Sequence, residues 1–75
     1  MQNDHELIHQ YQNGNRSAYD EIVRRHLSNT IGFFYTFTGD RMAAEDLAQD
    51  VFFKLYHHLK RFRFESAFTT YLYRI

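Results

Sequence analysis

Residues 44–59, AEDLAQDVFFKLYHHL, are expected to form the helix around which the rest of the chain is organised. At about 100° per residue, one side of a helix here collects six apolar residues that we expect to be buried: Ala44, Leu47, Ala48, Val51, Leu55 and Leu59. The opposite side collects Asp46, Gln49, Asp50, Phe53 and His57. A phenylalanine among carboxylates, on the side away from the core, indicates a surface that contacts more than water.

The rest of the chain is also expected to be helical, because glycines and polar cap residues recur at the spacing of helix ends. Gly14 and Gly39 can each end a helix, and Asn15 and Asp40 directly after them can cap the next one. The expected helices cover about residues 4–13, 16–38, 41–60 and 67–75. Their order predicts an all-α fold, a small three- to four-helix bundle built on a long antiparallel helical hairpin.

Some positions leave an alternative open. The first helix can start after Asn3 or Asp4, and Ser66 is the expected cap of the last helix. Residues 33–38 are rich in aromatic and β-branched side chains, which favours a strand, but the helical period is unbroken from Tyr19 onward. The alternation in RFRFES also fits a strand, although the stretch is short and we expect a loop.

The composition fits one small domain of 75 residues, with 44% hydrophobic and 19% aromatic residues. The absence of cysteine excludes disulfides and thiolate metal sites and fits a reducing compartment. No apolar run approaches the ~20 residues of a membrane span, and the N-terminus lacks a leader pattern. We therefore expect a cytoplasmic domain without membrane insertion, spanning residues 1–75 and truncated at its C-terminal end, where the last helical pattern is still running.

The net charge of zero conceals two halves of opposite sign. Residues 1–50 contain four basic and eight acidic residues, a net charge of −4, whereas residues 51–75 contain five basic residues and one acidic residue, a net charge of +4. This division suggests two different partners, one of them a polyanion. Chance clustering in a short chain is the alternative.

The sequence contains no recognisable catalytic constellation. It has no cysteine nucleophile, glycine-rich phosphate loop or zinc-binding His-Glu-x-x-His helix. His5 and His9 are four residues apart, but two ligands without a third make a poor metal site. We expect a protein that is not an enzyme and that needs no cofactor or metal.

The segment from Lys60 to Arg74 is a second candidate surface. Its cations alternate with aromatic residues, a pattern typical of proteins that bind single-stranded nucleic acid. We expect Phe62, Phe68, Tyr71 and Leu72 to belong to the core. The residues expected at nucleic acid are Lys60, Arg61, Arg63, Phe64, Ser66, Thr69, Thr70, Tyr73 and Arg74. Ordinary packing with solvated arginines is the alternative here, and the first helix or an absent segment could likewise cover Phe53.

These two surfaces together resemble a known family. The stretch AEDLAQDVFFKLY, followed by LKRFRFESAFTTYLYRI, is similar to region 2 of bacterial sigma factors, especially the compact extracytoplasmic-function group. The resemblance rests on residues 44–47 with Gln49, Asp50 and Phe52, and then on six residues at the spacing of the family: Phe62, Phe68, Thr70, Leu72, Tyr73 and Ile75. Gly14, Asn15, Ala18 and the turn at residues 38–40 extend the resemblance over nearly the whole chain.

The resemblance implies a transcription initiation domain with two binding functions. In the family, the helix that here carries Asp46, Gln49 and Asp50, with Phe53 beside them, docks on the clamp helices of the beta-prime subunit of core RNA polymerase. The segment that follows, here Arg61 to Tyr73, recognises the promoter −10 element as single-stranded non-template DNA. It holds a flipped base and helps to melt the duplex.

The resemblance also implies differences and an alternative. Tyr71 stands where the family commonly has a tryptophan, and the basic continuation of the last helix is not present after Ile75. An anti-sigma factor is a further expected partner. The alternative function is a sigma-like decoy, or regulatory module, that binds an anti-sigma factor, and a purely structural helical bundle is a third possibility.

Overall fold

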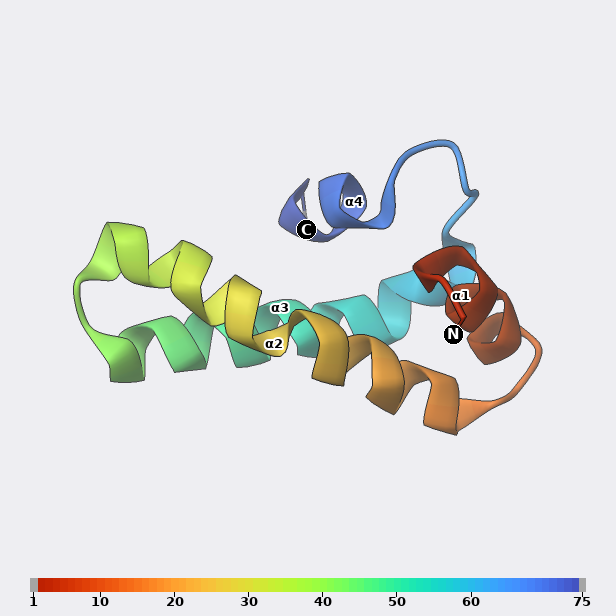
Figure 1. Cartoon of the computed structure of the whole chain (residues 1–75), viewed down its shortest axis with the longest axis horizontal. Helices are drawn as coiled ribbons and strands as arrows, with labels where there is room; N and C mark the ends of the chain where they lie inside the picture. Colours follow the sequence, from red (N-terminus) through yellow and green to blue (C-terminus); the bar gives the residue numbers. More distant parts are fainter. Residues whose placement is uncertain (1, 75) are drawn as a thin grey trace.

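The computed structural model describes residues 2–74, which form an antiparallel hairpin with two short helices packed on it (Figure 1). The hairpin runs along the long axis of a molecule that measures 37 × 23 × 23 Å. The elements are α1 (Asp4–Gln12), α2 (Arg16–Thr38), α3 (Arg41–His58), a 3-10 turn η1 (Leu59–Arg61) and α4 (Phe68–Arg74). No strand occurs within residues 2–74, so the all-α bundle and its hairpin are confirmed.

Side-chain caps begin the first three helices. The N–H groups of Glu6, Ser17 and Met42 donate to the side-chain oxygens of Asn3, Asn15 and Asp40, at 2.8, 3.1 and 3.0 Å. Gly39 adopts the left-handed conformation, with a φ of 62°, and its N–H donates to the Tyr35 carbonyl. The caps expected from the sequence are therefore confirmed at these ends, with Asn3 rather than Asp4 before α1.

Two helix ends differ from those expected. α3 ends at His58 rather than at residue 60, because the chain tightens into η1 before it leaves the helix. α4 begins at Phe68, so Ala67 occupies the position expected for the Ser66 cap, and the Ala67 carbonyl accepts the Tyr71 N–H at 3.2 Å. The assignment of Ser66 as a cap is therefore wrong. Ile75, expected in the last helix, lies outside the described residues.

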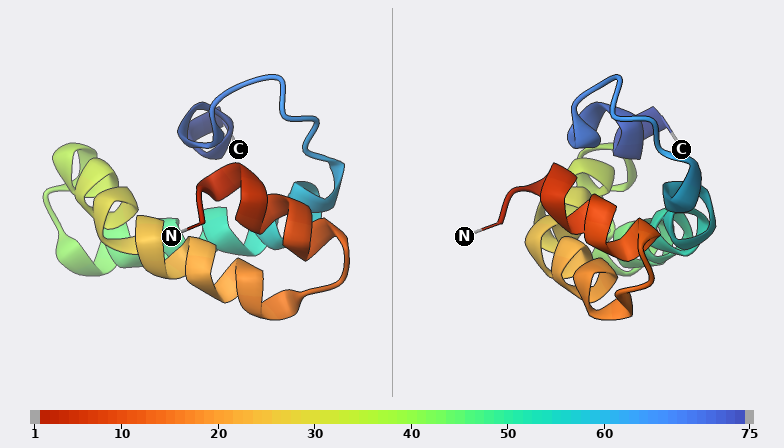
Figure 2. Two further views of the ribbon diagram at one scale, coloured as in Figure 1. Left: turned by 45° about the vertical axis from the view of Figure 1, so that its right-hand side comes forward. Right: turned by 90° about the vertical axis from the view of Figure 1, so that its right-hand side faces the viewer.

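The core lies where α1 and α4 cover one half of the hairpin (Figure 2). Each helix and η1 contribute to it, and its main members are Leu7, Ile8, Tyr11, Ala18, Ile22, Phe52, Leu55, Leu59, Phe62, Phe68 and Leu72. Four of the six stripe residues expected from α3 are fully buried, and Val51 is half-buried. The expected burial of Leu47 is wrong, because this residue is 39% exposed. Phe52, which is 6% exposed, lies in the core instead.

Polar side chains connect the helices through carbonyl groups of α3 and η1. The Tyr11 hydroxyl donates to the Tyr56 carbonyl at 2.7 Å, and the Tyr19 hydroxyl donates to the Phe52 carbonyl. The Gln12 side-chain amide donates to the Leu59 and Phe62 carbonyls, both at 3.0 Å. These bonds attach α1 and the start of α2 to the carboxyl end of α3.

The far end of the hairpin has little cover. Phe33, Tyr35, Phe37 and Met42 are between 40% and 75% exposed, although the helical period predicted burial for part of this end. α4 reaches only its near edge, where the Tyr73 ring stacks on Phe33 with a centroid separation of 4.7 Å. No helix within residues 2–74 is long and apolar enough to cross a membrane.

Leu55→Ala should destabilise the fold far more than Leu47→Ala, although the sequence places both leucines on the same stripe. Leu55 is fully buried, so its removal should lower the free energy of unfolding by about 2–5 kcal/mol. The partly exposed Leu47 should cost about 1 kcal/mol or less. Urea denaturation followed by circular dichroism measures both, and equal losses would contradict this assignment of the core.

Tyr19→Phe should change how stability depends on pH. Burial, followed by the nearby Tyr11 and Asp20, raises the pKa of Tyr19 to about 12 from an ordinary value of 10.0. The unfolded chain therefore loses this proton at lower pH than the folded chain does, and the free energy of unfolding should fall as pH rises from 10 to about 12. Urea denaturation across this range should show a shallower fall for Tyr19→Phe.

The matched control is Tyr35→Phe, which removes the hydroxyl of a half-exposed tyrosine from the same helix. It should retain the slope of the unmodified chain. If the slope of Tyr19→Phe equals that of the unmodified chain, deprotonation of Tyr19 does not contribute to the pH dependence of stability.

Candidate functional site

The exposed side of α3 carries the acidic and aromatic residues expected there. Asp46, Gln49, Asp50 and Phe53 follow one another at helical spacing, and all four are exposed. We define these four residues as the α3 face. The helix buries Ala48, Phe52 and Leu55, so packing of that side orients the α3 face toward solvent.

Phe53 is the apolar centre of the α3 face. Its side chain is 69% exposed, and its ring meets the His57 ring edge-to-face with a centroid separation of 5.1 Å. α1 packs on α2 and η1 and leaves this ring uncovered. The alternative in which the first helix covers Phe53 is therefore wrong. An exposed ring with a carboxylate rim has the composition of a small protein-binding patch.

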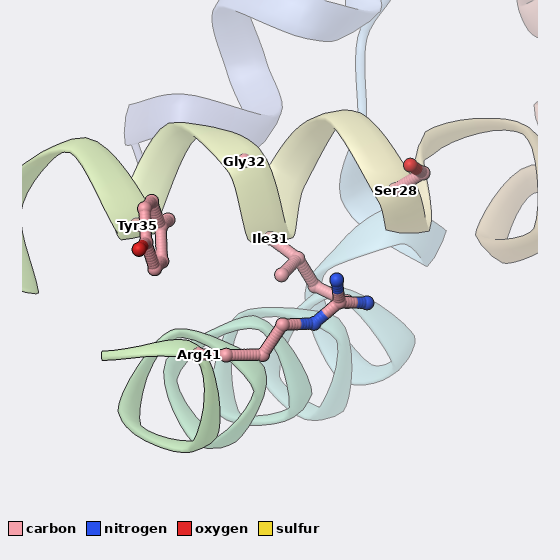
Figure 3. Close-up of a pocket in the computed structure, with 5 residues that line it drawn as sticks. All are labelled: Ser28, Ile31, Gly32, Tyr35 and Arg41. Carbon is pink, nitrogen blue, oxygen red and sulfur yellow. The ribbon is translucent and has the colours of Figure 1, made fainter. Parts of the chain in front are cut away.

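A groove between α2 and α3 adjoins the α3 face. It has a volume of about 710 Å³, and Gln49 and Phe53 line it together with Val23, Leu27 and Phe52. A second hollow of about 420 Å³ lies toward the tip of the hairpin. Figure 3 shows Arg41 extended from α3 into this hollow, toward Ile31 of α2, with the Tyr35 ring on the same side.

The groove has a mixed chemistry. Arg41 Nε donates to Glu45 Oε1 at 2.9 Å, and both residues line the groove beside its apolar side chains. The sequence did not indicate this groove, because it depends on how α2 and α3 approach each other. The only local signal is the recurrence of apolar residues every four positions on α2, at Tyr19, Val23, Leu27 and Ile31.

The cations of the basic segment, defined as residues 60–74, face solvent. Lys60, Arg61, Arg63 and Arg74 are exposed, and no ion pair involves them within the part of the chain that the structure describes. Thr69 and Thr70 are also exposed. Cations without carboxylate partners remain available to an anionic ligand.

The rings of the basic segment divide into core and surface, with one correction. Phe62, Phe68 and Leu72 are buried as expected. Tyr71 packs on the core and donates its hydroxyl to the His58 carbonyl at 3.1 Å, and burial raises its pKa above the ordinary value. Phe64 was expected to face outward but is half-buried, because its backbone turns the ring against α1.

Tyr73 is exposed on one side only. It retains 42% of its exposure while its other side stacks on Phe33 at an interplanar angle of 22°. The ring of a ligand could therefore stack only on the exposed side of Tyr73. This stack could not be predicted from the sequence, because Phe33 and Tyr73 lie forty positions apart.

A hollow of about 230 Å³ lies within the basic segment. Its lining residues are Arg61, Phe62, Arg63, Glu65, Ser66 and Tyr71. Two arginines, one glutamate, one serine and two aromatic residues thus line one space, a composition that suits a planar polar ligand. Three of the expected nucleic-acid residues, Arg61, Arg63 and Ser66, meet here, whereas Thr69, Thr70 and Arg74 lie outside its lining.

No cluster of three or more histidine, cysteine or carboxylate side chains with the geometry of a metal site occurs among residues 2–74. His5 and His9, the pair considered from the sequence, instead meet the Phe64 ring. Asp46 and Asp50 are both exposed and lie in no enclosed cleft.

Comparison with known proteins identifies the family of the chain. The family model of sigma-70 region 2 matches residues 22–75, which include α3 and the whole basic segment. The chain is 38% identical over 75 residues, all of its length, to the RNA polymerase sigma-H factor of Pseudomonas aeruginosa, and covers 39% of that protein.

Two extracytoplasmic-function sigma factors are also similar to nearly the whole chain. The chain is 35% identical over 72 residues to the ECF RNA polymerase sigma-E factor of Haemophilus influenzae, covering 96% of this chain and 38% of that protein. It is 32% identical over 68 residues to the ECF RNA polymerase sigma factor SigW of Bacillus subtilis, covering 91% and 36%. The chain thus spans less than two fifths of the length of these relatives. Because the family model matches nearly three quarters of the chain, the chain belongs to the sigma-70 region 2 family, of the extracytoplasmic-function type.

Proposed function

We propose that residues 1–75 form one region 2 domain of a transcription initiation factor, which binds core RNA polymerase and the promoter −10 element. The observation that carries this proposal is that α3 connects the two surfaces. α3 displays the α3 face along its side, and the basic segment leaves its carboxyl end. Such a domain contributes binding free energy and acts without a catalytic group or cofactor of its own.

The α3 face is the proposed site for the clamp helices of the beta-prime subunit. Phe53 would insert among apolar side chains of the partner, while Asp46 and Asp50 would accept hydrogen bonds from its arginines. Gln49 supplies both a donor and an acceptor. The groove beside Phe53 offers further apolar area to a helix that lies along α3.

The basic segment is the proposed site for single-stranded −10 DNA. Its exposed cations can hold phosphates, and the hollow bordered by Arg61, Arg63 and Tyr71 can receive one unstacked base. Extruding a base costs a few kcal/mol, which the hollow and the phosphate contacts must offset. Binding of the extruded form would in this way favour local melting of the promoter.

An anti-sigma factor is a further proposed partner. The α3 face would be its natural site, since a protein bound there would exclude polymerase. The surfaces of this domain would serve an initiation factor or a decoy equally well. Binding of single-stranded DNA by the complex with core polymerase favours the initiation factor, whereas a decoy predicts no such complex.

Asp50→Ala combined with Phe53→Ala should weaken binding to the beta-prime clamp helices without unfolding the domain, since both residues are exposed. Loss of a buried aromatic anchor and one charged hydrogen bond should reduce affinity roughly thirty-fold or more. A pull-down with purified clamp helices, quantified by biolayer interferometry, measures this loss.

Phe37→Ala is the matched control, because Phe37 is 75% exposed on the neighbouring helix and lies outside the α3 face. It should bind with the affinity of the unmodified chain. Equal binding by all three proteins would remove the assignment of the α3 face.

Arg63→Ala should weaken binding of single-stranded −10 oligonucleotides and lower its dependence on salt. Each lost phosphate contact should reduce the slope of log affinity against log salt by about 0.7. Fluorescence anisotropy at several salt concentrations measures both quantities, with the domain in complex with core polymerase. Arg24→Ala, which removes an exposed arginine of α2 paired with Glu21, should leave the slope unchanged. If Arg63→Ala behaves like this control, Arg63 is solvated surface.

A further inference from the structure

The loop that carries Arg63 and Phe64 rests against an exposed side of α1. The Phe64 ring meets the His5 and His9 rings, with centroid separations of 5.2 and 6.3 Å, and His5 also meets Phe62 at 5.7 Å. His5 and His9 lie one helical turn apart and are both exposed, and Phe64 is half-buried. We define His5, His9 and Phe64 as the histidine shelf.

The backbone at Phe64 is strained in a way that places its ring on this shelf. Its φ is 63°, in the left-handed region, and within residues 2–74 no other residue except glycine has a positive φ. A bulky side chain seldom adopts this conformation, and residues held in it concentrate at binding sites. The strain is therefore a second observation, besides the exposed rings, that marks the shelf.

The shelf continues the aromatic lining of the hollow in the basic segment. Tyr71 lines that hollow, its ring lies 4.7 Å from Phe62, and Phe62 in turn lies 4.9 Å from Phe64. Phe62 both lines the hollow and contacts the Phe64 ring, so one buried ring separates the hollow from the shelf. The exposed Arg61 and Arg63 flank Phe62 in the chain and can hold the phosphates that join two nucleotides.

We propose that the histidine shelf binds a second unpaired base, adjacent to the base held in the hollow. This inference rests on the proposed function. An imidazole ring can stack on a base and can also donate or accept a hydrogen bond at the edge of the base. His5 and His9 lie outside residues 22–75, so these two histidines are not part of the matched family model, whereas Phe64 is.

An abasic scan tests the shelf, because it shows which nucleotides contribute to binding through their bases. A single abasic site is moved through a mixed-sequence single-stranded oligonucleotide, and binding to the chain in complex with core polymerase is measured by fluorescence anisotropy. The unmodified chain should show two adjacent positions at which loss of the base weakens binding about five-fold or more. In His5→Ala combined with His9→Ala, one of these two penalties should disappear and the other should remain.

Two controls keep the result specific. Phe37→Ala removes an exposed ring from the carboxyl end of α2, outside the shelf and the α3 face, and should retain both penalties. His5→Gln combined with His9→Gln removes the rings but keeps polar, helix-forming side chains, so it replaces the alanine pair if circular dichroism shows that pair to be unfolded.

The outcomes separate the two proposals. If the unmodified chain in complex with core polymerase binds no single strand, the DNA-binding function itself is overturned, and the shelf with it. If the chain binds, but the abasic profile is the same with and without the two histidines, the shelf alone is overturned. His5 and His9 then serve only to pack the loop.

Discussion

The fold depends on how the carbonyl groups at the carboxyl end of α3 find hydrogen-bond donors. A helix leaves its last carbonyls without partners from its own backbone, and burying them unpaired is costly. Here side chains from α1 and α4 supply the donors. Tyr11, Gln12 and Tyr71 donate to carbonyls of Tyr56, His58, Leu59 and Phe62. The direction in which the chain leaves α3 is therefore set by α1 and α4 as well as by α3 itself.

This dependence gives α1 a role beyond completing the core. Gln12 holds the Leu59 and Phe62 carbonyls at opposite ends of η1, and Phe62 is the residue at which the basic segment turns away from η1. The same helix lies beside Phe64 through His5 and His9. A short helix outside the matched family model thus positions the segment in which we place nucleic-acid binding.

The sequence predicted what is determined locally and missed what depends on contacts between distant residues. Caps at Asn15 and Asp40 and the helical period need only neighbouring residues, so the helices and the exposed Phe53 could be predicted. The exchange of Leu47 for Phe52 in the core could not, because the helical wheel does not show from which direction the other helices approach. The ring contacts of Phe64 and Tyr73 join residues far apart in the sequence, and the cap at Ser66 was displaced when α4 began one residue later.

The two proposed surfaces are joined by a short and rigid connection. Phe53 and the end of α3 at His58 are separated by five residues of continuous helix, about 8 Å along its axis. η1 and its capping hydrogen bonds continue this rigid path to Phe62. Under the proposed function, a polymerase bound at the α3 face would therefore fix the place of the base-binding hollow without any change of conformation. Because less ordering would then remain when DNA binds, less of the binding free energy of the basic segment would be lost to entropy.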